Sequence, residues 1–305
     1  MMRLMNRFSD RTLNTIHFTY FPLYREGGGT TMRSEQLSQI VKPKMKELGF
    51  KVNYTKIDDK YENSIIYMPK MVILTSSDKL LSKLKEKNNI LIFDPIDGKI
   101  PDELMKYADV VVAASWEGYI FYKEKYHNKM IFRIDHHVDP RIRPQCTHEA
   151  FKVGYFGNLS NTIITDNIQK AVDVFPVDTS SQKDLSWMKK MPSYSLHYAV
   201  RRYKDNDGLK PATKIFTAAR CGANIIIQRS ETEAVHWLGQ DYPYICDDTS
   251  EKSILKTIEY ARSTCGEEQW NKGLRTMKNI DKAISYESIS RQFNDMVQEI
   301  RRVNG

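Results

Sequence analysis

Two lysines stand beside the predicted start of a helix in the second half of the sequence. Lys210 and Lys214 are four positions apart, and Pro211 between them suits a first helical turn, where its missing N–H group costs nothing. Free N–H groups and the helix dipole favour a phosphate at such a start. With Thr213 as a possible cap, both lysines can reach one anion. The alternative is an ordinary helix start with two solvated lysines.

Polar side chains also follow the predicted strands of the first half. Asp94 and Asp97 follow the strand predicted at residues 90–93, and His137 follows the one predicted at residues 130–134. Ligands of parallel sheets bind at the carboxyl ends of strands, so these residues are candidates to line a cleft. The aspartates are candidate acceptor-side bases, or they cap the turn. His137 is a candidate base or sugar contact, or a buried structural histidine.

The pair His136–His137 also raises the question of a metal site. Adjacent histidines on an extended chain point to opposite faces, so they do not easily share one ion. Asp135 and Asp139 lie nearby, but no third ligand has a helpful spacing. We therefore expect no metal ion and no cofactor.

Glycines follow a predicted strand in each half of the chain. Gly28 and Gly29 lie in a predicted glycine loop between the strand predicted at residues 15–21 and a helix, and Gly157 follows the strand predicted at residues 151–156. Glycines let the backbone approach a ligand closely, so both places can accept a phosphate or a sugar. Neither is a Walker loop or a GxGxxG fingerprint, because the required spacing is absent.

Two arginines precede the Lys214 region, and an apolar helix is predicted to contain it. Arg201 and Arg202 precede it, and at least one of them can form a forked contact with a diphosphate; two surface arginines are the alternative. After the lysines, Ala218 and Ala219 belong to an apolar helix face, and Cys221 and Gly222 end the helix, because glycine accepts a positive φ.

Strands and helices alternate along most of the chain, which predicts parallel sheets covered on both faces. We expect an α/β fold of two Rossmann-like domains, residues 1–149 and 150–285, joined by a polar linker at residues 141–149. Three helices are predicted after Tyr244: two close the second domain, at residues 250–264 and 267–284, and the last, at residues 286–305, follows it. The predicted strands lie at residues 15–21, 51–57, 71–75, 90–93, 110–114, 130–134, 151–156, 174–177, 194–200 and 223–227.

The composition narrows the class of protein. The 305 residues are 41% apolar and 11% aromatic, which is typical of a packed globular chain, and Lys+Arg exceed Asp+Glu by 46 to 38. The net charge of +8 favours anionic partners such as nucleotide-sugars, nucleic acid or acidic lipid. The scattered cysteines and the lack of a signal peptide or apolar span predict a cytoplasmic protein without a transmembrane segment.

One lysine-rich helix is a candidate for peripheral membrane contact. The helix predicted at residues 78–87 carries Lys79, Lys83, Lys85 and Lys87 beside leucines. Such a helix can touch a membrane surface or DNA, or it packs on the sheet as an ordinary amphipathic helix.

The stretch from Lys210 to Tyr244 resembles the donor-binding half of GT-B-type glycosyltransferases. There a helix with a K-x-x-x-A-x-x-x-G-like pattern leads into a buried strand and a loop with a glutamate. Here these positions are Lys214, Ala218, Gly222, the strand at residues 223–227, and Glu231 or Glu233. The closing LGQDYPY also resembles some bacterial and phage members.

This resemblance implies two domains facing a cleft, with the last helix crossing back to the first domain. It implies a metal-independent hexosyl- or pentosyltransferase that takes its sugar from a nucleotide-diphosphate-sugar, for example a UDP-sugar. The acceptor stays open: a glycan, a lipid-linked molecule, a protein or a modified DNA base. The expected catalytic residues are Asp97 and His137, and the expected donor-binding residues are Gly28, Gly29, Gly157, Arg201, Lys210, Thr213, Lys214, Glu231 and Glu233.

One departure from the family concerns the reaction's stereochemistry. Many retaining members carry two glutamates eight positions apart, whereas the matching positions here are Leu209 and Thr217. Asp207, Glu231 and Glu233 are the candidates to replace them. The alternative function is a nucleic-acid-binding or DNA-modifying accessory protein without sugar transfer, which the basic charge favours but no nucleic-acid-binding motif supports.

Overall fold

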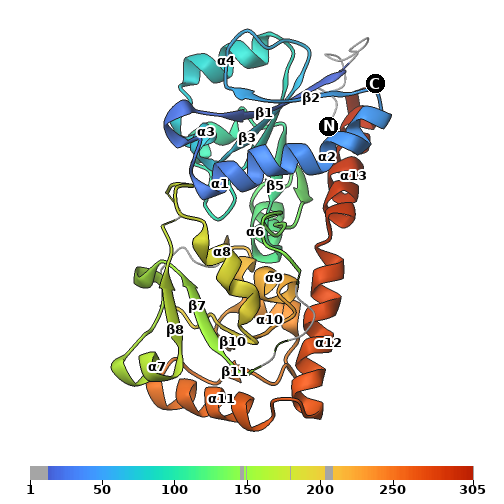
Figure 1. Ribbon diagram of the computed structural model, residues 1–305. Helices are drawn as coiled ribbons and strands as arrows, with labels where there is room; N and C mark the ends of the chain where they lie inside the picture. The colour runs from blue at the N-terminus through green and yellow to red at the C-terminus, as the bar shows by residue number, and fades with distance from the viewer. Residues whose placement is uncertain (1–12, 145–147, 149, 179, 203–208, 305) are drawn as a thin grey trace. The chain divides into compact units, whose positions relative to one another are not determined.

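The computed structural model describes residues 13–144, 148, 150–178, 180–202 and 209–304. It divides into two compact units (Figure 1). The first comprises the chain up to Asp135 and again from Tyr286, and the second comprises His136–Ser285. The sequence placed this break near Glu149, which lies outside the described residues, as does Asp207.

The first unit is built on a six-stranded sheet of order β2-β1-β3-β4-β5-β6. Every neighbouring pair of strands is parallel. The central strands are almost wholly buried, as expected where helices cover both faces of a sheet. The strands are β1 (Thr15–Tyr20), β2 (Lys51–Lys56), β3 (Ile65–Pro69), β4 (Ile90–Asp94), β5 (Val110–Ala113) and β6 (Met130–Arg133).

Alternate residues of these strands point to two separate apolar cores. Ile65 and Tyr67 belong to one core with residues of α2 and α13, whereas Ile66 and Met68 belong to the other with residues of α3 to α6. The helices are α1 (Gly28–Thr30), α2 (Leu37–Glu47), α3 (Lys70–Thr75), α4 (Asp78–Glu86), α5 (Asp102–Met105), α6 (Trp116–Lys125) and α13 (Tyr286–Asn304); η1 (Pro22–Tyr24) is a 3₁₀ turn and η2 (Thr31–Gln36) is π-helical.

Two predictions for this unit were wrong. Residues 71–75, predicted as a strand, lie in helix α3, and the strand is Ile65–Pro69 just before them. Both runs are short and apolar, so the periodicity of the sequence cannot separate a strand from a helix. In the structure, Ile65–Pro69 is the strand, because it pairs with β1 on one side and with β4 on the other. The glycine run is also not a free loop, because Gly28 and Gly29 form the first turn of a helix that continues through η2 into α2.

The lysine-rich helix α4 packs on the sheet. Leu81 and Leu84 are fully buried, while Lys83 pairs with Asp59 at 2.8 Å and Lys85 with Asp109 at 2.5 Å. These pairs neutralise part of the positive charge that suggested contact with a membrane or DNA. Among the described residues, no helix is both long enough and apolar enough to cross a membrane.

The second unit has a five-stranded sheet of order β11-β10-β9-β7-β8, again with parallel neighbours throughout. The two separate parallel sheets confirm the predicted α/β fold. The strands are β7 (Val153–Gly157), β8 (Asp173–Pro176), β9 (Leu196–Tyr198), β10 (Asn224–Gln228) and β11 (Ile245–Cys246). The helices are α7 (Asp166–Ala171), α8 (Ser186–Lys190), α9 (Thr213–Arg220), α10 (Thr232–Leu238), α11 (Glu251–Ser263) and α12 (Glu268–Ala283), with 3₁₀ turns η3 (Leu159–Asn161) and η4 (Met191–Ser193).

The strand order of the second unit creates a switch point. The chain passes from β7 outward to β8 and then returns to β9 on the opposite side of β7. The strand order therefore reverses between β7 and β9, and in open parallel sheets ligands bind at the carboxyl ends of strands beside this switch point. Gly157 ends β7 there, and Arg201 follows the end of β9.

Candidate functional site

Lys214 brings a positive charge to this switch point. It lies in the first turn of α9, and its Nζ donates a hydrogen bond of 2.7 Å to the carbonyl oxygen of Phe156 in β7. The same ammonium lies 4.3 Å from the centroid of the Tyr155 ring. The helix start and the carboxyl end of β7, far apart in sequence, are therefore joined by one lysine side chain.

The surroundings of Lys214 make its charge unusual. Burial, and secondarily the positive charge of Arg201, lower the pKa of the Lys214 ammonium to about 8. The side chain is thus still mainly protonated at pH 7. Within the described part of the chain, no carboxylate pairs with this ammonium.

Gly157 leaves room for this ammonium. A Cβ atom at Gly157 would lie 2.7 Å from Nζ of Lys214 and 2.9 Å from the hydroxyl oxygen of Tyr155, closer than such atoms can approach. The predicted glycine after β7 therefore allows the ends of two side chains to approach the backbone closely. Whether a ligand also uses this space stays a prediction.

Arg201 and Glu231 are brought together on the other side of the switch point. Nη2 of Arg201 lies 2.5 Å from Oε2 of Glu231, and both side chains are largely buried. The amide of Gln228 holds the backbone of Arg201, accepting from its N at 3.1 Å and donating to its O at 3.0 Å. Gln228 also donates to Glu231 at 3.2 Å. An anion that used Arg201 would share it with this carboxylate.

Three further residues of the second unit were predicted to bind the donor, and each has its own structural environment. Glu233 is buried and accepts a hydrogen bond of 3.1 Å from the indole nitrogen of Trp237 in the same helix. Lys210 is half-buried. Thr213 is not the helix cap: Ala212 occupies that position, and no side chain caps the helix. The reason is a tight turn, in which N of Thr213 bonds to O of Pro211 at 2.8 Å, so the proline precedes the helix.

Two residues without a carboxylate stand where many retaining enzymes carry the paired glutamates, and both have structural roles. Leu209 is buried, and the hydroxyl of Thr217 donates to the carbonyl of Thr213 at 2.8 Å within α9. Neither residue offers a carboxylate, as the sequence indicated.

Asp97, in the first unit, is already paired. Its Oδ1 lies 2.7 Å from Nζ of Lys70, and both side chains are about one-third exposed. The preceding turn is capped by Asp94, whose Oδ1 accepts from N of Ile96 at 3.0 Å. Ile96 has a φ of +63°, and a Cβ at Gly29 would lie 3.0 Å from its Cδ1. The turn that carries Asp97 therefore packs against the glycine helix start.

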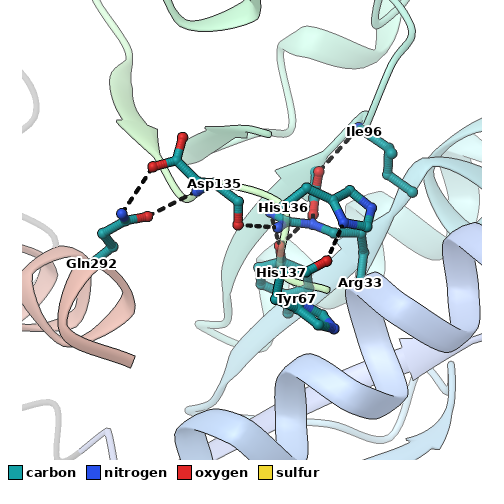
Figure 2. Close-up of polar contacts among 8 residues, drawn as sticks. Arg33, Tyr67, Ile96, Asp135, His136, His137 and Gln292 are labelled. Atoms are coloured by element: carbon teal, nitrogen blue, oxygen red, sulfur yellow. Dashed lines mark hydrogen bonds and ion pairs between the residues drawn. The ribbon is translucent and has the colours of Figure 1, made fainter. Parts of the chain in front are cut away.

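A buried ion pair that the sequence did not reveal lies beneath this turn. Nε of Arg33 lies 2.7 Å from Oδ2 of Asp94, and neither side chain is exposed. Figure 2 shows Arg33 beside Tyr67, whose hydroxyl donates to the same carboxylate oxygen, and beside the backbone of Asp135, whose carbonyl accepts from Nη1 at 3.1 Å. Burial alone would lower the pKa of the Arg33 guanidinium, but Asp94 and Tyr67 raise it above its ordinary value. Asp94 is thus a structural residue rather than an accessible base.

His137 lies just beyond this network in the sequence. Its side chain is buried, and its carbonyl oxygen is 3.0 Å from Nδ1 of His136. Its role as a base stays a prediction. No cluster of three or more histidine, cysteine, aspartate or glutamate side chains that could hold a metal ion occurs among the described residues.

No protein-family model and no curated protein matches the sequence. Solved structures match the fold. A glycosyltransferase from Rickettsia africae has a TM-score of 0.65 and 12% identity, with 95% of this chain and 99% of that chain covered. Sucrose-phosphate synthase from Thermosynechococcus elongatus has a TM-score of 0.62 and 9% identity over 95% of this chain and 99% of that chain. HepE from Anabaena, in complex with UDP and glucose, has a TM-score of 0.58 and 11% identity over 94% and 100%.

These similarities extend over almost the whole of both chains. The two parallel sheets, six-stranded and five-stranded, with their flanking helices match the fold of GT-B glycosyltransferases. At identities of 9–12% they establish the fold and not the activity.

Proposed function

We propose that the protein is a glycosyltransferase whose second unit binds a nucleotide-diphosphate-sugar at the switch point between β7 and β9. The observation that carries this proposal is the ammonium of Lys214, which is fixed against the carbonyl of Phe156 without a carboxylate partner among the described residues. Helix starts and lysines bind phosphate groups well. The structural neighbour HepE, which is in complex with UDP and glucose, supports this class of donor.

In this proposal the sugar's anomeric carbon loses its bond to the diphosphate and gains one to an acceptor oxygen. The acceptor proton passes to a base, for which Asp97 and His137 are the candidates. Lys214, with Lys210 and Arg201, stabilises the negative charge that develops on the leaving diphosphate, so the reaction proceeds without a metal. The net charge of +8 favours an anionic acceptor, such as DNA.

Calorimetric titration of UDP, GDP and ADP, with and without EDTA, tests the proposal. A charge-assisted contact is worth roughly 1.5–3 kcal/mol, so Lys214→Ala should weaken the tightest nucleotide about tenfold to a hundredfold. Lys42→Ala removes an exposed lysine of α2 and should leave binding unchanged. Equal affinity of the wild type and Lys214→Ala would remove Lys214 from the site. Activity that EDTA abolished and Mg²⁺ restored would refute the metal-free mechanism.

A further inference from the structure

The ring of Tyr155 lies directly beneath the Lys214 ammonium. We propose that Tyr155 is a positioning residue, which holds this ammonium at the carboxyl end of β7 so that it is already in place when an anion arrives. The inference rests on the proposed function, because the positioned ammonium is the group that would bind the donor diphosphate. Tyr155 itself would not touch the donor.

Tyr155 is fixed at its hydroxyl and at its ring. Its side chain is only 1% exposed, and its hydroxyl donates a hydrogen bond of 2.7 Å to the carbonyl of Asn158 in the turn after β7. The ring also meets the ring of Tyr198 in β9 edge to face, with centroids 6.2 Å apart and planes at 74°. The ring therefore has a defined orientation on which another group can rest.

The ammonium is held by two different attractions. Its distance of 4.3 Å from the ring centroid is within cation–π range, and the carbonyl of Phe156 accepts one of its hydrogen bonds at 2.7 Å. An ammonium has three donors, so others remain for an anion. A free lysine loses rotamer freedom when it binds a ligand, whereas a lysine that is already ordered does not pay this cost again.

Lys214 is the group of this cluster that changes charge near neutral pH. Burial and then Arg201 lower its pKa to about 8. His197 in β9 is neutral near pH 7, because burial lowers its pKa to about 4, and burial raises the pKa of Tyr155 to about 12. Titration between pH 7 and 9 therefore reports on Lys214.

The test compares Tyr155→Leu, which removes the ring, with Tyr155→Phe, which keeps it. NMR titration of the labelled lysine Cε groups gives the pKa of Lys214, whose signal is the one missing in Lys214→Ala. In Tyr155→Leu the lysine should turn towards water, and its pKa should rise from about 8 towards 10.5. The affinity for the tightest of UDP, GDP and ADP should fall about 5- to 30-fold. Tyr155→Phe should keep both wild-type values.

Tyr244→Leu is the matched control, because Tyr244 is another fully buried tyrosine of the same unit, packed against Tyr242, Tyr260 and Trp270. It should leave the Lys214 titration unchanged. An unaltered Lys214 pKa in folded Tyr155→Leu would overturn the inference.

A wild-type measurement covers the case in which Tyr155→Leu does not fold. The Lys214 ε-methylene protons should be shifted upfield by the ring, and ordinary shifts would overturn the inference. Absence of nucleotide binding by the wild type would instead count against the proposed function, while the NMR results would still decide the role of Tyr155.

Discussion

Gly157 and the Lys214 ammonium share one small space at the end of β7. The sequence singled out both residues, but their contact joins the helix start to a strand 58 positions earlier and could not be read from local spacing. Tyr155 and Gln228 were missed for the same reason: each lies in a mostly apolar strand, and its contacts with Lys214 and Arg201, respectively, join residues distant in sequence. Arg33 and Asp94, 61 positions apart, form a further example.

A methyl group at Gly157 should disturb the site more than the fold. In Gly157→Ala the new Cβ meets the far end of the Lys214 side chain, which can move away, and the hydroxyl of Tyr155, which is hydrogen-bonded to Asn158. We therefore expect nucleotide affinity to fall about tenfold, with a smaller loss of stability from the crowding of Tyr155. Calorimetry and thermal unfolding measure the two effects. In the Gly157→Ala, Lys214→Ala double variant the loss should equal that of Lys214→Ala alone. Additive losses would show that Gly157 acts independently of the lysine.

His197 should make the second unit sensitive to acid. Burial holds the pKa of His197 at about 4, against 6.5 in an unfolded chain, so between these values the unfolded state binds more protons and stability falls as the pH falls. From the two pKa values this loss is about 2 kcal/mol at pH 5. Urea unfolding of His197→Gln between pH 7 and 5 should show a shallower decline. His127→Gln, at an exposed histidine, should retain the wild-type slope.

At the scale of elements, the helix α9 and the strand β10 were predicted more completely than the region around β3. The helix ends at Cys221 and Gly222, with φ of +63° at the glycine, and the buried strand follows as expected. Here the helical spacing, the glycine and the apolar run all indicate the same boundary between helix and strand. In the first unit, the apolar run of α3 resembles a strand, and only pairing with β1 and β4 identifies Ile65–Pro69 as the true one.

Gly222→Ala should weaken this connection between helix and strand. An alanine at a φ of +63° is strained by about 1–2 kcal/mol relative to glycine. Denaturant titration of the variant should show this loss, with nucleotide affinity retained because Gly222 lies at the opposite end of α9 from Lys214. Wild-type stability would mean that the turn relaxes to a negative φ.

At the scale of the whole molecule, the first unit is completed by α13. Ile289, Phe293 and Ile300 are fully buried in the same core as Ile16 and Phe18 of β1. The resemblance to GT-B enzymes predicted that the last helix returns to the first domain, and the structure confirms it. The composition of this helix alone would not have shown which unit it completes, because its apolar face fits any covered sheet.

Phe293→Ala should therefore destabilise the first unit. Phe293 stacks on Phe18 with ring centroids 5.4 Å apart and is fully buried, so the truncation should cost about 3–5 kcal/mol. Circular dichroism with denaturant measures this loss. Gln298→Ala, at an exposed position of the same helix, should cost little. Equal stability of the two variants would contradict the placement of α13 on the sheet.

The chain order of the two units also bears on how the protein is made. A ribosome delivers the six strands of the first unit early, yet the helix that covers one of their faces emerges only after the entire second unit. During that interval Ile16, Phe18 and their neighbours lack the side chains of α13, whereas the second unit comes from one uninterrupted stretch. The later unit can thus mature before the earlier one, and one face of the first sheet stays incompletely covered until the last helix is synthesised.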